Sequence, residues 1–399
     1  MLGAGVQGVC ASLALRRRGY DVTVIDRSPN ALLRTSLRNE GKVHLGFLFA
    51  NDRSMRTAEL LMQGALRFSS LVDGWFGEAM PWAEFSTGTF TYCLGTTSLL
   101  SGDEILSHYE KVQSLYEKLS EDRSLSYLGT RPGRIWTEAE SSSIPELSRT
   151  YASPLAQTLE VALDRELMND WMRDRFNDND EIAHRYNHTV KSVSREPHGF
   201  IVKCIGPDQS DVSLRADIVV NCLWDGRLAI DKTMGISYDR PWVHRLKYRV
   251  FVDLPDHLSG MPPMTFVLGP YGDIVTFRDG LTYLSYYPVS IQGWTSELQP
   301  PSSWDAPCEG RPDPVLAHDV AERVVKELSF AIPGLEEAAI RKVDAGAIFT
   351  WGETDIDDPR SEIHERFDVG VHAHDGYFSI DTGKFTTAPL FADQLQQFL

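Results

Sequence analysis

The sequence lacks a long hydrophobic segment. No apolar run approaches the ~18 residues that a membrane-spanning helix requires. The chain opens directly into a glycine-rich turn at residue 3, without the charged and apolar regions of a signal peptide. We therefore expect a cytoplasmic protein without an integral membrane segment.

Cysteine is scarce and follows no pattern. The chain has 5 cysteines, and no two are spaced as a C-x-x-C pair. This argues against a disulfide framework and against a cysteine-based metal site. We expect reduced thiols and no bound metal. The cysteines are Cys10, Cys93, Cys204, Cys222 and Cys308.

A surplus of positive charge is also missing. Lysine and arginine number 39 against 56 aspartate and glutamate residues, which gives a net charge of −17. Such a surface repels nucleic acid and anionic lipid, so neither is an expected partner. A buried pocket for a small anion remains compatible with this charge, because net charge does not describe a buried site.

The composition is that of a globular protein, with 42% hydrophobic and 24% charged residues. At 399 residues the chain is longer than one compact core usually allows, so two domains are expected.

A glycine turn begins the chain. Gly3, Gly5 and Gly8 form a G-x-G-x-x-G turn, followed by a small apolar helix to about residue 18 and a β-branched strand over 22–25. In a dinucleotide-binding unit the glycines allow a tight turn, close approach of a pyrophosphate and close helix packing. The residues expected to contact the cofactor here are Gly3, Gly5, Val6, Gln7, Gly8, Asp26 and Arg27.

Asp26 lies at the end of the strand that follows the turn. A carboxylate at this place accepts hydrogen bonds from ribose hydroxyls and repels a 2′-phosphate. Only Met1 and Leu2 precede the turn, whereas such a fold starts with a full strand. We expect that the natural start lies upstream; a truncation is the alternative.

The remaining pattern alternates between helices and strands. Helices are expected over 51–77, 160–175 and 315–331, and near the C-terminus. Strands are expected over 84–95, 181–188, 200–204 and 215–221, and the segment 244–290 reads as an antiparallel meander.

The loop after Asp26 distinguishes between cofactors. It carries small polar residues and the spacing Asn39-x-Gly41-x-x-His44-x-Gly46, with Ser54 and Arg56 beyond. This segment resembles the flavin-contact loop of the D-amino-acid oxidase superfamily, and is closest to L-2-hydroxyglutarate dehydrogenases. The resemblance implies that the pyrophosphate of FAD lies near Thr35 and Ser36. It places the flavin ring near Asn39, Gly41, Lys42, Val43 and His44.

Two further segments resemble this superfamily. The strand 216–226 is similar to its ADxVVNAAG motif, although Cys222, Leu223 and Trp224 stand where small residues are usual. Val190 and Lys191 lie where the family often binds adenine through the backbone. The segment 376–387 is similar to the GGKxTT motif of FAD-linked glycerol-3-phosphate dehydrogenases, which implies cofactor contacts of Gly376, Gly383, Lys384, Phe385 and Thr386.

Four segments resemble motifs of this superfamily and follow one another in the same order as in the family, and this resemblance implies the fold. We expect an α/β chain with a Rossmann-like FAD-binding domain on a mixed parallel sheet and a substrate domain on an antiparallel sheet. The first would comprise residues 1–79, 151–227 and 346–399, and the second 80–150 and 228–345. FAD is expected to bind non-covalently, although His44 is a candidate for a covalent link.

The resemblance implies hydride transfer to flavin N5 from a small hydroxy acid, amino acid or amine. The catalytic candidates are Lys42, His44, Arg278 and Tyr286, and an arginine with a tyrosine could clamp a carboxylate. An alcohol substrate needs a base, which His44 could supply. Further candidates are Arg249, Tyr271, Tyr283, His372 and His374.

Other readings remain open. An aromatic strand over 283–287 suits a larger substrate such as a sugar, in a biosynthetic flavoenzyme. A degenerate protein without flavin is a further alternative. The acidic stretch 352–365 is either a loop near the entrance of the site or a solvated connection. The electron acceptor is not specified by the sequence.

Overall fold

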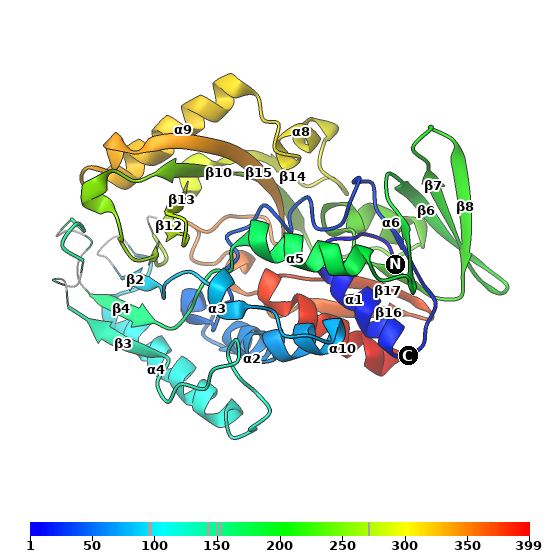
Figure 1. The fold of residues 1–399 in the computed structure, drawn as a ribbon, viewed down its shortest axis with the longest axis horizontal. Coiled ribbons are helices and arrows are strands. Elements are labelled where there is room, and N and C mark those ends of the chain that lie inside the picture. Colours follow the sequence, from blue (N-terminus) through cyan, green and yellow to red (C-terminus); the bar gives the residue numbers. More distant parts are fainter. Residues whose placement is uncertain (95–97, 141, 143, 149–150, 152–153, 270–271) are drawn as a thin grey trace.

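The computed structural model describes residues 1–94, 98–140, 142, 144–148, 151, 154–269 and 272–399. Figure 1 shows two halves placed side by side. One half is built on a small sheet near both chain termini, and the other on a large, strongly twisted sheet. A three-stranded antiparallel sheet, β6 (Thr189–Glu196), β7 (Gly199–Ile205) and β8 (Asp211–Ala216), projects beyond the first half.

The small sheet is mixed and mainly parallel. Strand β1 (Val22–Ile25) runs parallel to β5 (Ile182–Arg185), and β9 (Val219–Asn221) runs parallel to β17 (Tyr377–Asp381), which pairs antiparallel with β16 (Gly370–His374). Leu2 joins these groups, because it bridges in parallel to both Ile25 and Asn221. The predicted mixed parallel sheet is confirmed, and Leu2 occupies the position of its central strand.

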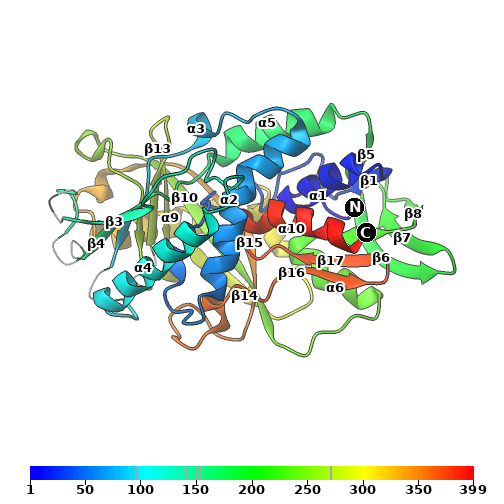
Figure 2. The same cartoon turned by 90° about the horizontal axis from the view of Figure 1, so that it is seen from below.

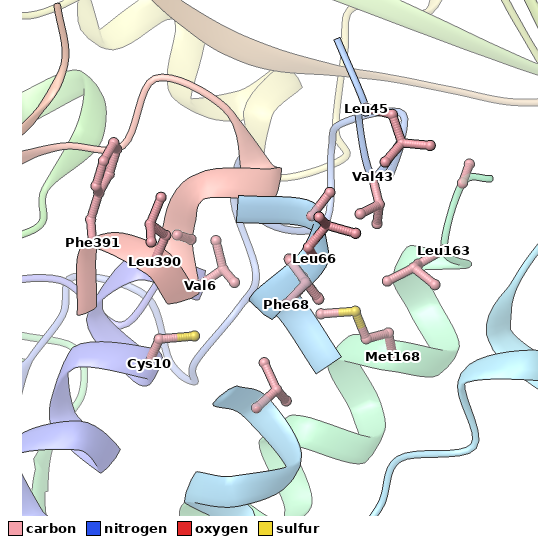
Figure 3. Close-up of a cluster of buried hydrophobic side chains, with 14 of the residues drawn as sticks. Val6, Cys10, Val43, Leu45, Leu66, Phe68, Leu163, Met168, Leu390 and Phe391 are labelled. Carbon is pink, nitrogen blue, oxygen red and sulfur yellow. The ribbon is translucent and has the colours of Figure 1, made fainter. Parts of the chain in front are cut away.

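Helices cover this sheet. They are α1 (Val6–Arg17), α2 (Arg56–Phe76), α5 (Arg165–Asn177) and α10 (Ala388–Leu395), with α6 (Arg227–Thr233) beside β6. Figure 2 shows α1, α2 and α10 next to one another. Their shared apolar core is drawn in Figure 3, where Val6 and Cys10 of α1 lie close to Leu390 and Phe391 of α10.

Among the described residues, the large sheet has nine strands. Strand β10 (Trp242–Asp253) pairs along its length with β15 (Ala339–Trp351), and its other edge pairs with β13 (Leu281–Tyr286) and then β14 (Ile291–Thr295). The sheet continues through β12 (Gly272–Thr276), β11 (Met264–Phe266), β2 (Thr91–Cys93), β4 (Leu155–Thr158) and β3 (Trp136–Ala139). The predicted antiparallel meander is therefore present.

The two faces of this sheet differ in character. Along β10, Leu246, Tyr248 and Val250 pack into a core with α9 (Pro314–Ser329) on the outer face. Alternation along the strand turns Lys247 and Arg249 to the other face, toward the small sheet. Further helices are α3 (Trp82–Phe85), α4 (Gly102–Leu119), α7 (Tyr287–Ser290) and α8 (Asp305–Cys308).

Two predicted elements differ from the structure, and two strands were not predicted. The helix expected over 160–175 begins at Arg165, because Asp164 caps it by accepting from the N–H groups of Glu166 and Leu167. Of the residues before it, Ala162 and Leu163 instead make isolated β-bridges to Lys42 and Ser86. The strand expected over 84–95 shortens to β2, since Trp82–Phe85 forms a helical turn. Strands β6 and β8, which are partly exposed on one face, were not expected.

Sheet membership also bears on the expected domain boundaries. Strand β4 pairs with β2 and β3 in the large sheet, although residues 151–227 were assigned to the cofactor domain. Strand β15 continues across the boundary at 345–346. Within the residues that the structure describes, no helix is both long and apolar enough to cross a membrane.

Candidate active site

A long cavity lies between the small sheet and the inner face of the large sheet. It begins at the glycine turn and ends among β10, β12 and β13. Most of the residues predicted to bind the cofactor line it. These are Gly3, Gly5, Val6, Gln7, Asp26, Arg27, Thr35, Ser36, Asn39, Lys42, His44, Gly383, Lys384 and Phe385.

The glycine turn packs as the sequence predicts. A Cβ on Gly8 would lie 1.9 Å from the carbonyl oxygen of Gly3, so α1 packs directly on the turn only because residue 8 has no side chain. Gly3 has φ +95°, and its Cβ would lie 2.7 Å from the Cys222 carbonyl. A Cβ on Gly5 would meet only the Ser36 hydroxyl, at 3.1 Å, so this position faces the cavity.

Asp26 and Ser36 hold the turn from two sides. The Asp26 carboxylate accepts from the N–H of Ala4 and from that of Ser28, both at 2.7 Å. The Ser36 hydroxyl accepts from the N–H of Val6 at 2.8 Å, at the start of α1. A carboxylate oxygen has more than one lone pair, so Asp26 can still accept from a ligand hydroxyl.

Leu223, Trp224 and Asp225 form the wall of the cavity beside the glycine turn. The Trp224 ring nitrogen donates to the Ala347 carbonyl at 2.8 Å, which ties the end of β9 to β15. Arg34 forms ion pairs with Asp225 at 3.1 Å and with Asp305 at 2.9 Å. The bulky segment at 222–224 thus closes the junction of the two halves.

The loop over 39–46 alternates between cavity and core. Lys42 and His44 line the cavity, whereas Val43 and Leu45 are fully buried in the hydrophobic cluster of Figure 3. Gly41 does not reach the cavity. Its φ is +74°, and a Cβ there would lie 2.2 Å from the Leu163 carbonyl, so this glycine allows the loop to pass the start of α5.

Lys42 is buried and fully engaged. Its ammonium donates to the Thr265 hydroxyl at 2.6 Å and lies 3.2 Å from the Asp273 carboxylate. It also lies 4.1 Å from the centre of the Phe90 ring. Lys42 therefore links the cofactor loop to β11 and β12, and its positive charge remains next to the cavity.

His44 lies between two carboxylates and is only 2% exposed. Its Nδ1 is 3.5 Å from a Glu160 oxygen, and its Nε2 is 3.9 Å from a Glu40 oxygen. Burial raises the pKa of Glu40, but contact with His44 and the charges of Lys384 and Lys247 hold it well below its ordinary value. A histidine in this setting can hold or pass a proton.

The segment 382–387 after β17, called the closing segment below, is held by polar contacts with buried residues. The Asp381 carboxylate accepts from the Gly383 N–H at 3.1 Å and forms an ion pair with the buried Arg227 at 3.2 Å. The Thr386 hydroxyl accepts from the His44 N–H at 3.0 Å and donates to the Lys42 carbonyl at 3.3 Å. Thr386 therefore does not line the cavity but connects the two segments that do.

Positive charge gathers at the inner end of the cavity. Burial lowers the pKa of Lys384 to about 8, and the charges of Arg366 and Lys247 act in the same direction, against the attraction of Glu40. Burial also lowers the pKa of Lys247, but Tyr283, Glu40 and Asp273 raise it above its ordinary value. Lys247 is thus charged at neutral pH.

Two predicted residues lie away from the cavity, and a third is already paired. Tyr286 shares the parity of Leu284 on β13 and packs toward the α9 core, while Tyr283 faces the cavity. Arg278 follows the end of β12, and its guanidinium donates to the Ser86 and Ala83 carbonyls. Arg249 reaches the cavity wall but forms a bidentate pair with Asp344, at 2.8 Å for each bond.

Other residues predicted for the site also lie away from the cavity. Val190 packs against the core of the three-stranded sheet, and Gly376 forms the tight turn between β16 and β17. His372 and His374 on β16 do not line the cavity. Tyr271 lies outside the described residues.

Sequence reasoning missed part of the site. Lys247 lies two residues before Arg249 on β10 and therefore on the same face of the strand, so the sequence could have identified it as a site residue. Glu160, a lone acid within an apolar segment, was assigned to a helix. Ile356, Ile363 and His364 line the cavity, so the acidic stretch 352–365 lies at the site and is not only a solvated connection.

Comparison of the sequence with models of known protein families identifies the family of this chain. A model of the FAD dependent oxidoreductase family, DAO, matches residues 2–348. The chain belongs to this family. FAD is accordingly its cofactor. The glycine turn fits it, because Gly5 presents bare backbone to the cavity, while Gly3 and Gly8 allow the tight turn and the close packing of α1.

Solved structures share the DAO fold over nearly the whole chain. Glycine oxidase from Geobacillus kaustophilus is 13% identical, with a TM-score of 0.70 and coverage of 99% of this chain and 92% of that one. L-proline dehydrogenase from P. horikoshii is 14% identical, with a TM-score of 0.66 and coverage of 99% and 89%. These values show the fold alone.

Curated relatives match a short segment of the chain. D-amino acid dehydrogenase from Rhizobium johnstonii is 47% identical over 47 residues. The match spans 12% of this chain and 11% of the relative. The closer kinship with L-2-hydroxyglutarate or glycerol-3-phosphate dehydrogenases remains a prediction.

Proposed function

We propose that this DAO-family oxidoreductase oxidises a small organic acid that carries an amino group next to its carboxylate. The observation that carries the proposal is the positive charge that lines the inner end of the cavity. Lys42, Lys247, Lys384 and Arg366 outnumber the carboxylates of Glu40 and Asp273 there.

Lys247 is the best candidate to bind the substrate carboxylate. Lys42 already has an ion-pair partner in Asp273, whereas no carboxylate of the described residues lies within 4.0 Å of the Lys247 ammonium. The hydroxyl of Tyr283, which also lines the cavity, is buried without a hydrogen-bond partner in this part of the structure. A bound carboxylate would pair with the first group and accept from the second.

FAD would be held along the rest of the cavity. We propose contacts of its phosphates with the turn at Gly3 and Gly5 and with Ser36, of its ribose with Asp26, and of its ring with the segments that carry His44 and Lys384. When bound, FAD accepts two electrons and the hydrogen of the substrate C–H bond. We propose that it binds non-covalently, with the discontinuous domain division expected from the sequence and β4 joined to the substrate sheet.

The chain's own residues handle the proton and exclude water. His44 can take the proton that leaves the substrate nitrogen or oxygen, and the positive charge of Lys384 suits the negative charge of a reduced cofactor. Ile356 and Ile363 close the cavity wall from the 352–365 segment and keep it apolar there.

Two features favour different substrate classes. Relatives named for amino acids, such as the glycine oxidase, the L-proline dehydrogenase and the D-amino acid dehydrogenase, support an amine. A hydroxy acid is the second candidate. The buried His44 favours it, because an alcohol must lose its hydroxyl proton whereas a neutral amine need not.

An anaerobic screen tests the proposal. FAD-loaded protein is mixed with D- and L-amino acids, N-methylated glycines, 2-hydroxy acids and sugars, and bleaching of the flavin absorbance near ~450 nm is recorded. Bleaching by an amino acid supports the first candidate, and bleaching by a hydroxy acid alone supports the second. Bleaching only by uncharged sugars would overturn the anion site.

The Lys247→Met variant locates the anion site. We expect KM for the active acid to rise by about 100-fold, since a buried charge-assisted contact is lost, while the flavin spectrum stays unchanged. Lys203→Met, at an exposed position of β7, is the matched control and should leave KM unchanged. An unchanged KM in Lys247→Met would contradict this role.

A further inference from the structure

The carboxylate behind His44 is unusually well fixed. Glu160 is fully buried. One of its oxygens accepts from the Leu45 N–H at 2.5 Å, and the other accepts from the Tyr92 hydroxyl. That second oxygen is also the one 3.5 Å from Nδ1 of His44. The carboxylate is therefore held in a single orientation toward the histidine ring.

Glu160 carries its charge at neutral pH. Burial raises the pKa of Glu160, but contact with His44 and the charges of His44 and Lys42 lower it further, to below its ordinary value. An isolated buried carboxylate would be very unfavourable, so this one needs nearby positive or proton-donating groups. Nδ1 of His44 is the neighbouring nitrogen with no hydrogen-bond partner at present among the described residues.

We propose that Glu160 is a positioning residue, which accepts the Nδ1 proton of His44 and so leaves Nε2 free to take a proton from the substrate. This inference rests on the proposed role of His44 in substrate oxidation. A shift of about half an ångström would turn the 3.5 Å contact into a hydrogen bond, and such bonds often tighten when a catalytic complex forms. Glu160 itself touches neither substrate nor cofactor in this scheme.

The other groups around the ring cannot replace Glu160. Glu40 lies toward Nε2, at 3.9 Å, and its side chain is 25% exposed. Lys42, Lys247 and Lys384 contribute positive charge and cannot accept a proton from Nδ1 while protonated. The phenols that face Glu160 are Tyr92, Tyr109 and Tyr127, and burial and its negative charge raise the pKa of each well above the ordinary value.

The Glu160→Gln variant distinguishes a role in positioning His44 from a purely structural role. The Leu45 N–H needs an acceptor, so the amide oxygen must remain at the position that faces it. The amide nitrogen then replaces the oxygen next to His44, and the Tyr92 hydroxyl can rotate to accept from it. An N–H group facing Nδ1 favours the tautomer that carries its proton on Nε2, which can no longer accept one.

Nitrogen-15 NMR of the histidine rings shows directly which ring nitrogen of His44 carries the proton. The His44 signals are assigned by their loss in His44→Gln, in both FAD-loaded and FAD-free protein. We expect Nδ1–H in the wild type and Nε2–H in Glu160→Gln. An Nε2–H tautomer in the wild type would overturn the proposal, whether or not the variant folds and whether or not a substrate has been found.

Anaerobic flavin bleaching by the substrate found in the screen supplies the second readout. In Glu160→Gln we expect the rate at pH 7 to fall by about 100-fold, KM to change by less than about threefold, and the acid limb of the pH profile to move to lower pH. Glu110→Gln, an exposed glutamate on α4, is the matched control and should behave as the wild type.

The outcomes keep the two proposals apart. If no tested acid bleaches the wild type, the proposed function fails, and the tautomer measurement still decides the role of Glu160. If the wild type is active but Glu160→Gln keeps its rate, pH profile and Nδ1–H tautomer, the inference is wrong and the proposed function stands. Loss of bound FAD in the variant with an unchanged tautomer would likewise assign Glu160 a purely supporting role.

Discussion

At the scale of single residues, the cavity concentrates groups that are costly to bury. Lys384 is the clearest case, because it is charged, largely enclosed and close to Arg366 and Lys247. Such a residue lowers the stability of the flavin-free chain and becomes useful only when an anion lies beside it.

The pH dependence of stability tests this. The pKa of Lys384 is about 8 in the folded chain against 10.5 for an ordinary lysine, so the folded state binds this proton less tightly than the unfolded state does. The resulting penalty is complete below pH 8 and fades as the pH rises through 10.5. We expect Lys384→Met to raise the free energy of unfolding of the FAD-free protein by about 2 to 3 kcal/mol at pH 7, and by almost nothing near pH ~11.

Urea unfolding of FAD-free protein at several pH values measures the effect. Lys326→Met, at an exposed position on α9, is the control and should change stability little at any of them. A destabilised Lys384→Met at pH 7 would show that the ammonium is already well paired.

Residue-level prediction succeeded where a motif specified a backbone conformation. Gly3, Gly5 and Gly8 form the tight turn that their spacing predicts, and Lys42 and His44 line the cavity, while their contacts with FAD stay a prediction. It failed where the face of a strand decides the outcome. Tyr286 and Arg278 were chosen by residue type, but parity turns the first outward and the end of β12 displaces the second.

At the scale of elements, helix α2 bears on the site through one close approach. A Cβ on Gly64 would lie 2.8 Å from the Thr386 carbonyl, whereas Gly74 on the same helix has no heavy atom within 4 Å of its Cβ position. The helix therefore supports the closing segment at its first glycine and is free of packing constraints at the second.

Alanine substitutions at the two glycines should act in opposite directions. Gly74→Ala removes the entropic cost of glycine in a helix, and we expect it to stabilise the chain by about 0.5 to 1 kcal/mol. Gly64→Ala must push the Thr386 backbone, so we expect a loss of about 1 to 3 kcal/mol together with weaker FAD binding. Thermal melting and fluorescence titration with FAD measure both.

The pair controls for helix propensity, since both variants introduce the same residue into the same helix. Equal stabilisation by the two substitutions would mean that α2 can move away from the closing segment at no cost.

Element prediction from sequence followed the strength of the local signal. Helices α1, α2 and α9 have a clear apolar face or a capping glycine, and each was found within a few residues of its true ends. Strand β4 was missed because pairing with strands far away in the sequence defines it. The short run at 155–158 has no pattern of its own until β2 and β3 flank it.

At the scale of the whole molecule, the cavity joins parts of the chain that are far apart in sequence. Its lining takes backbone from the first turn, side chains from the large sheet and the closing segment before α10. A ligand that reaches from Asp26 to Lys384 contacts both the first turn and the closing segment, so it should stabilise the chain more than a shorter ligand does.

Thermal melting with two flavins tests this length argument. At a free concentration of about 100 times its Kd, FAD adds about 2.7 kcal/mol, which corresponds to about 3 °C for a chain of 399 residues. FMN at the same concentration should raise Tm by less than half as much, because it lacks the adenosine part that the turn and Asp26 would hold. Gly5→Val should abolish the FAD increment while the FAD-free Tm changes little, since its Cβ meets only the Ser36 hydroxyl, at 3.1 Å. Gly133→Val, with open space around its Cβ, is the control that should keep the increment. Equal increments from FMN and FAD would mean that the glycine turn does not hold the dinucleotide.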